Sequence, residues 1–328
     1  MNTTESNEDL STFNASTAPT TEDRVEYFIR CILLVITTIL LLTLNLLCLV
    51  VLRHVHSIPE TTKVFLRSMT VADLGVGLFR ALPMTVLAIS KVDHFYGALC
   101  TVLAFADNVV YFSPQMSLLL LTVDRYISVV HALRYPALVT VKRARISVCC
   151  MWALPAVIAT VCAFYKNWEA VYIQSLQYCS FQLESSVIIE TIMYGILLVC
   201  TMFVALIAYS QLFMISRHQA RAIQVENQIA QPGNPPARPD NKALKTVLNI
   251  VVTATVFNLL PLCVFLALDE LTEWPIVILL LVVLPILTNS WFNVVIYYLR
   301  NQEFRRATRN LLRSEEHTSE LQSLRHLV

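Results

Sequence analysis

Charged residues and glycine are both scarce in this chain of 328 residues. Only 14% of the residues are charged and 5 are glycine, whereas 56% are hydrophobic. A soluble domain averages about 25% charged residues, so the composition argues against a soluble protein. The shortage of glycine argues against a turn-rich β fold and favours helices. The net charge of +1 gives no sign of a nucleic-acid partner, and we expect none.

Groups that carry out chemistry are missing from the long apolar runs of the chain. All 7 histidines lie outside these runs. No nucleophile with a matching base, and no set of metal ligands, stands inside them, although an intramembrane enzyme needs such groups facing one another. The two halves of the chain also lack the internal symmetry of many transporters. We therefore expect neither enzymatic activity nor a catalytic cofactor.

Seven apolar runs are each about as long as the roughly 20 residues that cross a bilayer, or longer. They occupy residues 27–52, 64–89, 99–130, 147–164, 187–213, 246–268 and 275–298. The first run begins too far into the chain, and is too long, for a signal peptide. The sequence thus predicts an all-α membrane protein, a seven-transmembrane helix bundle embedded in the lipid bilayer.

Lysine and arginine are concentrated in alternate loops between these runs. The loops after the first, third and fifth runs contain both, as at Arg134 and Lys142, and the segment after the seventh run contains several arginines. By the positive-inside rule these loops face the cytoplasm and the N-terminus lies outside. Glycosylation sequons at Asn2 and Asn14, in the polar leader of residues 1–26, agree with an extracellular N-terminus. We expect a multi-pass protein of the plasma membrane with a glycosylated leader.

The third run carries polar groups at both ends and is expected to organise the bundle. Asp107 and Arg125 are 18 residues, or five helical turns, apart and therefore project from about the same side of a straight helix. They would lie roughly 27 Å apart, which is close to the ~30 Å thickness of the hydrocarbon layer. This arrangement suits a protein that detects a signal on one side of a membrane and responds on the other.

The runs also carry a set of polar and aromatic residues in a characteristic order. The members of the set are Asn45, Ala72-Asp73, Cys100, Asp124-Arg125-Tyr126, Trp152, Cys179, Tyr209, Asn289-Ser290, Asn293 and Tyr297. In this order the chain resembles the rhodopsin-like (class A) G-protein-coupled receptors over residues 27–312. The resemblance implies a receptor domain at 27–299 and a short amphipathic helix on the cytoplasmic surface at 300–312. It also implies an extracellular ligand, a heterotrimeric G protein and arrestin as partners.

The resemblance assigns roles to several residues. It implies a disulfide between Cys100 and Cys179. The residues implied in activation and G-protein coupling are Asp124, Arg125, Tyr126, Tyr209 and Tyr297. A polar cluster of Asn45, Asp73, Asn289, Ser290 and Asn293 would hold an allosteric sodium ion. A hydrogen-bonded network without sodium is an equal alternative, because Pro114 stands where the family usually has a serine ligand.

Asp107 stands where amine receptors of this family bind the ammonium group of the ligand. A carboxylate there would form a charge-assisted hydrogen bond with a protonated amine. Peptide receptors carry an acid at the same place, so a peptide ligand is an alternative, and Arg80 could instead pair with Asp107 and neutralise it. We favour a cationic, amine-like small molecule. The further candidate contacts are Arg80, Tyr111, Glu190 and Tyr194.

Several positions depart from the pattern of the family. Leu259 replaces a tryptophan beneath the ligand, and residues 274–299 contain no lysine, which excludes a retinal-binding opsin. Gln115, Thr201 and Thr255 replace apolar or kinking residues, and we expect them to bond to one another, because a lone buried amide is costly in lipid. A constitutively active receptor or a non-signalling membrane scaffold is therefore a further alternative.

The end of the chain does not resemble a receptor tail. Residues 313–328 include Ser314-Glu315-Glu316-His317-Thr318-Ser319, a string that resembles the translation of a common sequencing-library adapter. We expect these residues to be non-native and leave them out of the functional reasoning.

Overall fold

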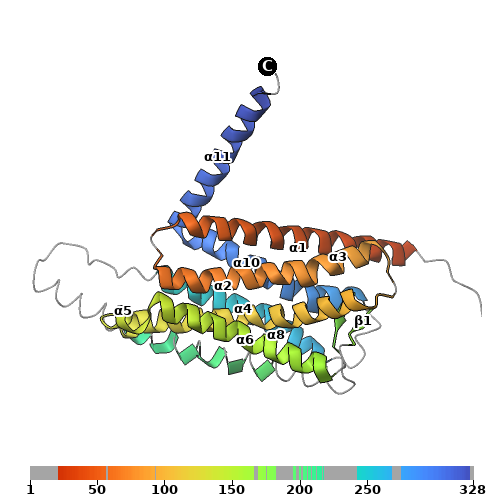
Figure 1. Cartoon of the computed structure of the whole chain (residues 1–328), viewed down its shortest axis with the longest axis horizontal. Helices are drawn as coiled ribbons and strands as arrows, with labels where there is room; N and C mark the ends of the chain where they lie inside the picture. Colours follow the sequence, from red (N-terminus) through yellow and green to blue (C-terminus); the bar gives the residue numbers. More distant parts are fainter. Residues whose placement is uncertain are drawn as a thin grey trace, which may run out of the picture.

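Long helices lie side by side along the length of the molecule (Figure 1). The computed structural model describes residues 21–56, 58–92, 94–165, 169–174, 176–181, 242–267 and 275–325, and residues 195–217 with gaps. The long helices are α1 (Thr21–His54), α2 (Glu60–Val76), α4 (Ala98–Val130), α6 (Val141–Tyr165), α8 (Lys242–Ala267), α10 (Leu284–Arg300) and α11 (Gln302–Arg325). The shorter ones are α3 (Leu82–Ile89), α5 (Tyr135–Leu138) and α9 (Pro275–Ile278).

The apolar runs of the sequence correspond closely to these helices. Six of the seven runs fall on described helices, and the described part of the fifth includes the apolar helical stretch Met202–Ile215. Helix α6, which contains the fourth apolar run, begins at Val141, six residues before that run, because the basic residues that precede the run are also helical. The expectation of helices is therefore confirmed. The hairpin of β1 (Val171–Ile173) and β2 (Tyr178–Ser180), which pairs Tyr172 with Cys179, was not expected.

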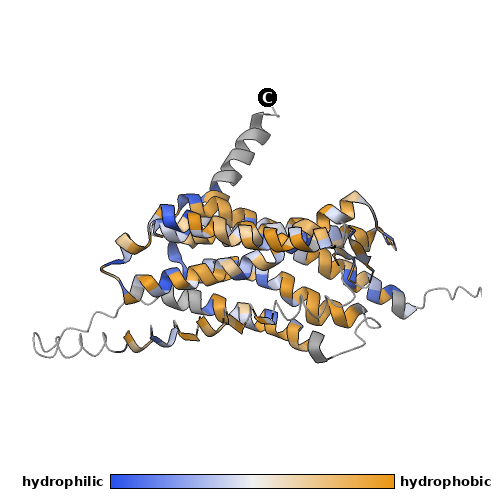
Figure 2. Cartoon of the chain, turned by 60° about the horizontal axis from the view of Figure 1, so that its bottom comes forward, coloured by the Kyte–Doolittle hydropathy of each residue, from blue (hydrophilic) through white to orange (hydrophobic). Residues whose placement is uncertain are grey.

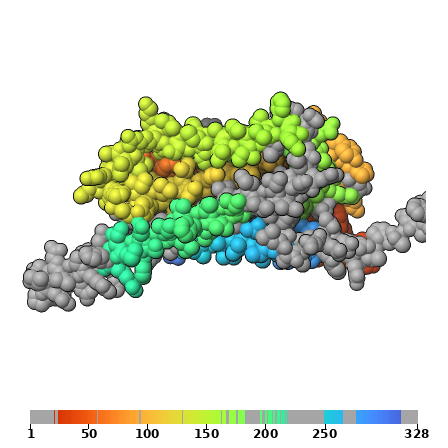
Figure 3. All heavy atoms as spheres, turned by 90° about the horizontal axis from the view of Figure 1, so that it is seen from below, coloured from red at the N-terminus to blue at the C-terminus, as the bar shows by residue number. Residues whose placement is uncertain are grey.

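Four of the described helical segments are long and apolar enough to cross a membrane. They are Arg24–His54, Glu60–Ile89, Val141–Tyr165 and Ile276–Arg300. Large apolar side chains on their outer faces are exposed, as at Val161 and Phe164 of α6. Figure 2 shows apolar residues along the length of the bundle. Figure 3 shows the side of the molecule on which both α6 and the described parts of residues 195–217 lie. Such faces suit contact with lipid.

Two helical runs contain a π-helical turn in the half of the bundle opposite Arg125. The first turn, Gly77–Ala81, joins α2 to α3, and the second, Leu279–Val283, joins α9 to α10. Each ends two residues before a proline, Pro83 or Pro285. Proline has no N–H and its ring displaces the carbonyl four residues earlier, so a wider turn accommodates it. The first of these turns carries Arg80.

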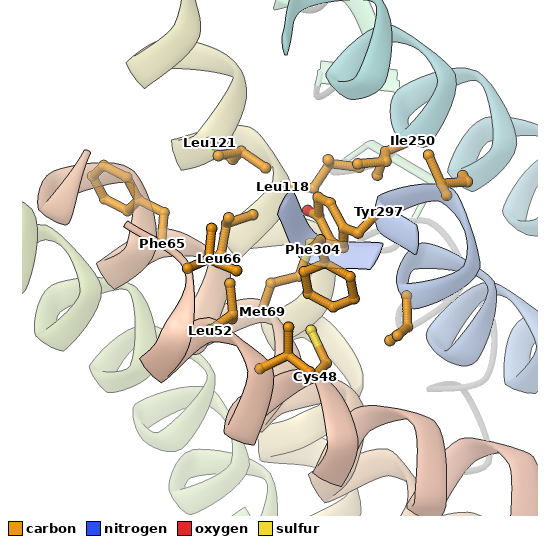
Figure 4. Packing of buried hydrophobic residues seen from close by; sticks show 14 of the residues in the cluster. Cys48, Leu52, Phe65, Leu66, Met69, Leu118, Leu121, Ile250, Tyr297 and Phe304 are labelled. Carbon is orange, nitrogen blue, oxygen red and sulfur yellow. The ribbon is translucent and has the colours of Figure 1, made fainter. Parts of the chain in front are cut away.

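The largest apolar cluster fills the end of the bundle that contains Arg125, called the Arg125 end below. Figure 4 shows side chains of α1, α2, α4, α8, α10 and α11 meeting there. Phe304 of α11 is 2% exposed and its ring lies 6.3 Å from that of Tyr297. The start of α11 is thereby fixed to the bundle. The helix then continues to Arg325 and points away from the bundle (Figure 1), so a surface helix at 300–312 and a boundary at 313 stay predictions.

Helices α2, α4 and α6 are joined by a buried polar contact. The indole Nε1 of Trp152 donates to Ser68 Oγ at 3.0 Å, and Ser68 Oγ lies 3.2 Å from Ser117 Oγ. These bonds satisfy polar groups that would otherwise be buried without partners. They hold α2 between its two neighbours.

Gly75 of α2 packs tightly against Val110 of α4. A Cβ atom built there would lie 2.7 Å from Val110 Cγ1. We predict that Gly75→Val lowers the free energy of unfolding by about 1–3 kcal/mol, because overpacking forces neighbouring helices apart. Thermal unfolding of the purified protein in detergent measures this. Val71→Leu, at a residue of α2 that is 45% exposed, is the control and should leave the melting temperature unchanged; equal temperatures for both variants would contradict the prediction.

Candidate functional site

Arg80 and Asp107 form a two-point ion pair between the π turn and α4. Arg80 Nε donates to Asp107 Oδ1 at 2.7 Å and Nη2 donates to Oδ2 at 2.6 Å. The Arg80 side chain is 15% exposed and that of Asp107 is 6% exposed. Paired, charge-assisted hydrogen bonds of this kind are among the strongest in proteins. Of the two roles considered for Asp107, pairing with Arg80 is the one present in this structure.

Two tyrosine rings flank the guanidinium group of Arg80. Its Cζ atom lies 4.3 Å from the ring centre of Tyr111 and 5.3 Å from that of Tyr178. Tyr111 is one helical turn beyond Asp107 on α4, so the carboxylate and one ring share a face of that helix. Aromatic faces attract cations through the ring quadrupole. Asp107, Tyr111 and Tyr178 together surround a positive charge, and that charge belongs to the chain itself.

The predicted disulfide explains how Tyr178 reaches this position. Cys100 of α4 and Cys179 of β2 are bonded, with their Cα atoms 5.5 Å apart. Both are buried, together with Phe181, in a small cluster where β2 packs on α4. The bond confirms the expected pairing. It holds the strand against the helix, so that the neighbouring residue, Tyr178, lies over Arg80.

Other predicted residues of this region cannot be placed. Glu190, Tyr194 and the glycosylation sites Asn2 and Asn14 lie outside the described residues. Tyr178 was not predicted, although its position next to Cys179 could have indicated it once the disulfide was assumed.

The predicted polar cluster is assembled deep in the bundle. Asn293 Nδ2 donates to Asp73 Oδ2 at 3.3 Å, and Asn45 Nδ2 donates to the carbonyl groups of Leu41 at 2.9 Å and Ser290 at 3.2 Å. Within this cluster, four buried side-chain oxygens accept no bond from a described residue: Oδ1 of Asn45, Asp73, Asn289 and Asn293. Four buried acceptors without a donor are unusual and need a partner. Oxygen ligands of this type fit a hard cation.

Asp124 is the centre of a network at the Arg125 end. Its Oδ2 accepts from Arg125 Nη2 at 2.6 Å and from Thr62 Oγ1 at 3.0 Å, while its Oδ1 accepts from Tyr135 at 2.7 Å. The Arg125 Nη2 group also contacts Thr62 Oγ1. Burial, together with the bond to Asp124, raises the pKa of the Tyr135 phenol, which keeps its proton available for donation. Thr62 and Tyr135 were not among the predicted site residues.

The remaining predicted activation residues lie at the same end of the bundle. Tyr126 donates to Gln211 Oε1 at 2.6 Å and so connects α4 to the described part of the fifth run. The hydroxyl groups of Tyr209 and Tyr297 are buried and bond to no described residue.

The expected bonds among Gln115, Thr201 and Thr255 are not formed by the residues that are described. Thr255 Oγ1 lies 2.6 Å from its own helical carbonyl at Val251 and 2.6 Å from Met202 Sδ. Gln115 is 4% exposed and makes no bond to Thr255. The expectation is therefore wrong for this pair, because the threonine hydroxyl is satisfied within α8. Thr201 lies outside the described residues.

Comparison with known proteins agrees with the arrangement of residues around the Arg80–Asp107 pair and at the Arg125 end. The family described as "7 transmembrane receptor (rhodopsin family)" matches residues 44–313. The chain belongs to this family. The receptor is accordingly a multi-pass protein of the plasma membrane with a seven-helix bundle, and it is a signalling protein, not an enzyme.

Individual relatives are named as trace amine-associated receptors and as an adrenergic receptor. The receptor is similar to Trace amine-associated receptor 6 of Mus musculus, with 27% identity over 82% of this chain and 80% of that protein. It is similar to Trace amine-associated receptor 9 of Homo sapiens, with 26% identity over 84% of each chain. Alpha-1A adrenergic receptor of Bos taurus is 27% identical over 52% of this chain, and the match spans only 35% of the length of that relative.

The ion pair predicts an unequal cost for single and double substitutions. Asp107→Leu leaves a buried guanidinium unpaired, and we expect it to lower the free energy of unfolding by about 3 kcal/mol. Arg80→Met should have a similar effect for the converse reason. The double variant, with neither charge, should lie within about 1 kcal/mol of the wild type. Thermal unfolding of the wild type, both single variants and the double variant in detergent completes this double-mutant cycle. If the losses in free energy of unfolding of the two single variants add up in the double variant, the two side chains do not interact.

Proposed function

We propose that this receptor couples the binding of an extracellular ligand that carries an amino group to the activation of a heterotrimeric G protein. The observation that carries the proposal is the cation-binding arrangement of Asp107, Tyr111 and Tyr178. A carboxylate and two aromatic faces are suited to a protonated amine. The relatives named as trace amine-associated and adrenergic receptors support the same ligand class.

The proposed orientation places the Cys100 end outside the cell and the Arg125 end in the cytoplasm. Disulfides persist on the oxidising, extracellular side of a membrane, which favours this direction for Cys100–Cys179. The opposite end carries the basic residues, among them Arg53, Arg134 and Lys142, as the positive-inside rule requires. The N-terminus is then extracellular and the surface that meets the G protein and arrestin surrounds Arg125.

Signalling requires two arrangements of the helices with different affinities for the ligand. In the arrangement described here, Arg125 donates to Asp124 and to Thr62 of α2, while Tyr135 of α5 donates to Asp124. We propose that the ligand favours a second arrangement in which Arg125 leaves Asp124 and becomes available to the G protein. The hydroxyl groups of Tyr209 and Tyr297, which bond to no described residue, are the proposed new partners of Arg125 within the bundle.

Two alternatives rest on specific observations. A peptide could present its amino group to Asp107, since nothing in the pair itself restricts the size of the ligand. A receptor that is active without a ligand, or a scaffold that does not signal, is favoured by two departures from the family's activation motifs. Leu259 stands where the family usually has a tryptophan, and Val294 stands where it usually has the proline of the seventh-span motif.

Substitution of Arg125 distinguishes signalling from scaffolding. We expect Arg125→Ala to reduce receptor-stimulated nucleotide exchange on a G protein at least about tenfold, because the residue that would contact the G protein is removed. Exchange is measured with reconstituted receptor, with and without ligand. Arg53→Ala, at an exposed arginine of α1, serves as the control and should retain exchange. A wild-type receptor that promotes no exchange under any condition would support the scaffold instead.

We propose further that the polar cluster binds sodium. The residues that would hold it are Asp73, Asn45, Asn289 and Asn293, whose Oδ1 atoms face no described donor. A sodium ion would supply a positive charge beside the Asp73 carboxylate and stabilise the arrangement in which these oxygens converge. The family resemblance associates this effect with the inactive state.

Exchange of potassium for sodium tests the cluster without any ligand. At a sodium concentration a few times the dissociation constant, binding should stabilise the wild type by about 1 kcal/mol relative to potassium at equal ionic strength. Asp73→Asn removes the charge and should abolish the difference. The measurement is thermal unfolding in each salt. The same sodium effect in wild type and Asp73→Asn would exclude this site.

A further inference from the structure

We infer that the ligand of the Arg80–Asp107 site carries a carboxylate as well as an ammonium group, as a free amino acid does, and binds by separating the pair. This inference rests on the proposed function and narrows the class of ligand. It follows from the charge of the site: Asp107 is not a free anion but one half of a neutral pair.

Both oxygens of Asp107 are already engaged. Oδ1 accepts from Arg80 Nε and Oδ2 accepts from Nη2, and the carboxylate is 6% exposed. An incoming ammonium group can reach Asp107 only where Arg80 withdraws. The tyrosine faces that would also attract the ammonium are occupied by the same guanidinium. A simple amine must therefore displace a cation that is covalently tethered beside its anion.

The consequence for affinity depends on which charge is left behind. A simple amine takes Asp107 and leaves Arg80 unpaired, and a simple acid takes Arg80 and leaves Asp107 unpaired. Leaving one partner of a buried pair unsatisfied costs enough to weaken binding by about a hundredfold or more. A ligand with both groups supplies a new partner to each residue. Among the described residues, Asp107 is the one carboxylate that contacts Arg80.

The geometry of Arg80 shows where such a ligand would begin to bind. Its side chain is more exposed than that of Asp107, at 15% against 6%. Its Nη1 group bonds to no described residue and is not among the fully buried polar atoms. A carboxylate can therefore bind Nη1 while the pair is still closed. The long, flexible arginine side chain then allows the guanidinium to turn away from Asp107, which becomes available to the ammonium group.

Sets of three related compounds test the inference directly. Each set contains an amino acid, the amine that lacks its carboxylate and the acid that lacks its amino group, such as L-tyrosine, tyramine and 3-(4-hydroxyphenyl)propionate. Sets built on each of the common amino acids cover different side chains. Binding is measured as the concentration dependence of the thermal stability of purified receptor, which does not require a G protein.

We expect at least one amino acid to bind the wild type ten times or more tightly than its own amine and its own acid. In Arg80→Ala the order should reverse, because Asp107 becomes a free anion that favours the amine. Arg80→Lys retains the charge without the two-point geometry and should keep the wild-type order with lower affinity. Arg67→Ala, at the other end of the same helical run, where Arg67 donates to the carbonyl of Leu52, should change nothing.

Two results would overturn the inference: an amine that binds the wild type as tightly as its amino acid, or no binding by any amino acid in the panel. If Arg80→Ala does not fold, Arg80→Lys and Asp107→Asn still test the inference, since Asp107→Asn should abolish the preference for the amino acid over the acid.

The outcome for this inference can be separated from the outcome for the proposed function. An amine that activates a G protein through Asp107 would refute only the inference, whereas an amino acid that binds without promoting nucleotide exchange would refute only the coupling.

Discussion

A buried arginine and a buried aspartate can stay charged inside this bundle only while they neutralise each other. Several features of this half of the molecule support that contact. The π turn Gly77–Ala81 carries Arg80, the disulfide holds β2 against α4, and the rings of Tyr111 and Tyr178 flank the guanidinium. Together they place both charged groups of the pair between the π turn, α4 and β2.

The other end of α4 repeats the same chemistry. There Asp124 engages Arg125, and Thr62 of α2 contacts both of them. The helical run that begins with α2 thus meets α4 through the ion pair of Arg80 with Asp107, through the hydrogen bonds of Thr62 to Asp124 and Arg125, and through the close approach of Gly75 to Val110 between them. Under the proposed function, these contacts are the route by which ligand binding at the Arg80–Asp107 pair would influence Arg125.

The sequence predicted the helices and the positions of the polar groups because both depend on local patterns. Apolar runs set the helices, and the family resemblance identified Cys100, Cys179 and the cluster around Asp73. It could not decide between a ligand and Arg80 as the partner of Asp107, since that depends on how a π turn orients one side chain. Tyr178, Thr62 and Tyr135 were missed because their roles arise from contacts between distant segments. The expected bond between Gln115 and Thr255 was wrong because a threonine in a helix can satisfy its hydroxyl on its own backbone.

Nitrogen-15 NMR of the arginine side chains in reconstituted receptor tests the ion pair most directly. Two simultaneous hydrogen bonds restrict rotation about the bond between Cζ and Nε. The account predicts a guanidinium group with slow rotation and separate Nη signals in the ligand-free wild type that is lost in Asp107→Asn and retained in Asp124→Asn. Arg125 also donates to Asp124 through Nε and Nη2, and its signals are distinguished because Asp124→Asn, and not Asp107→Asn, removes its partner. A ligand-free spectrum without such a group, or one that Asp107→Asn leaves unchanged, would contradict it.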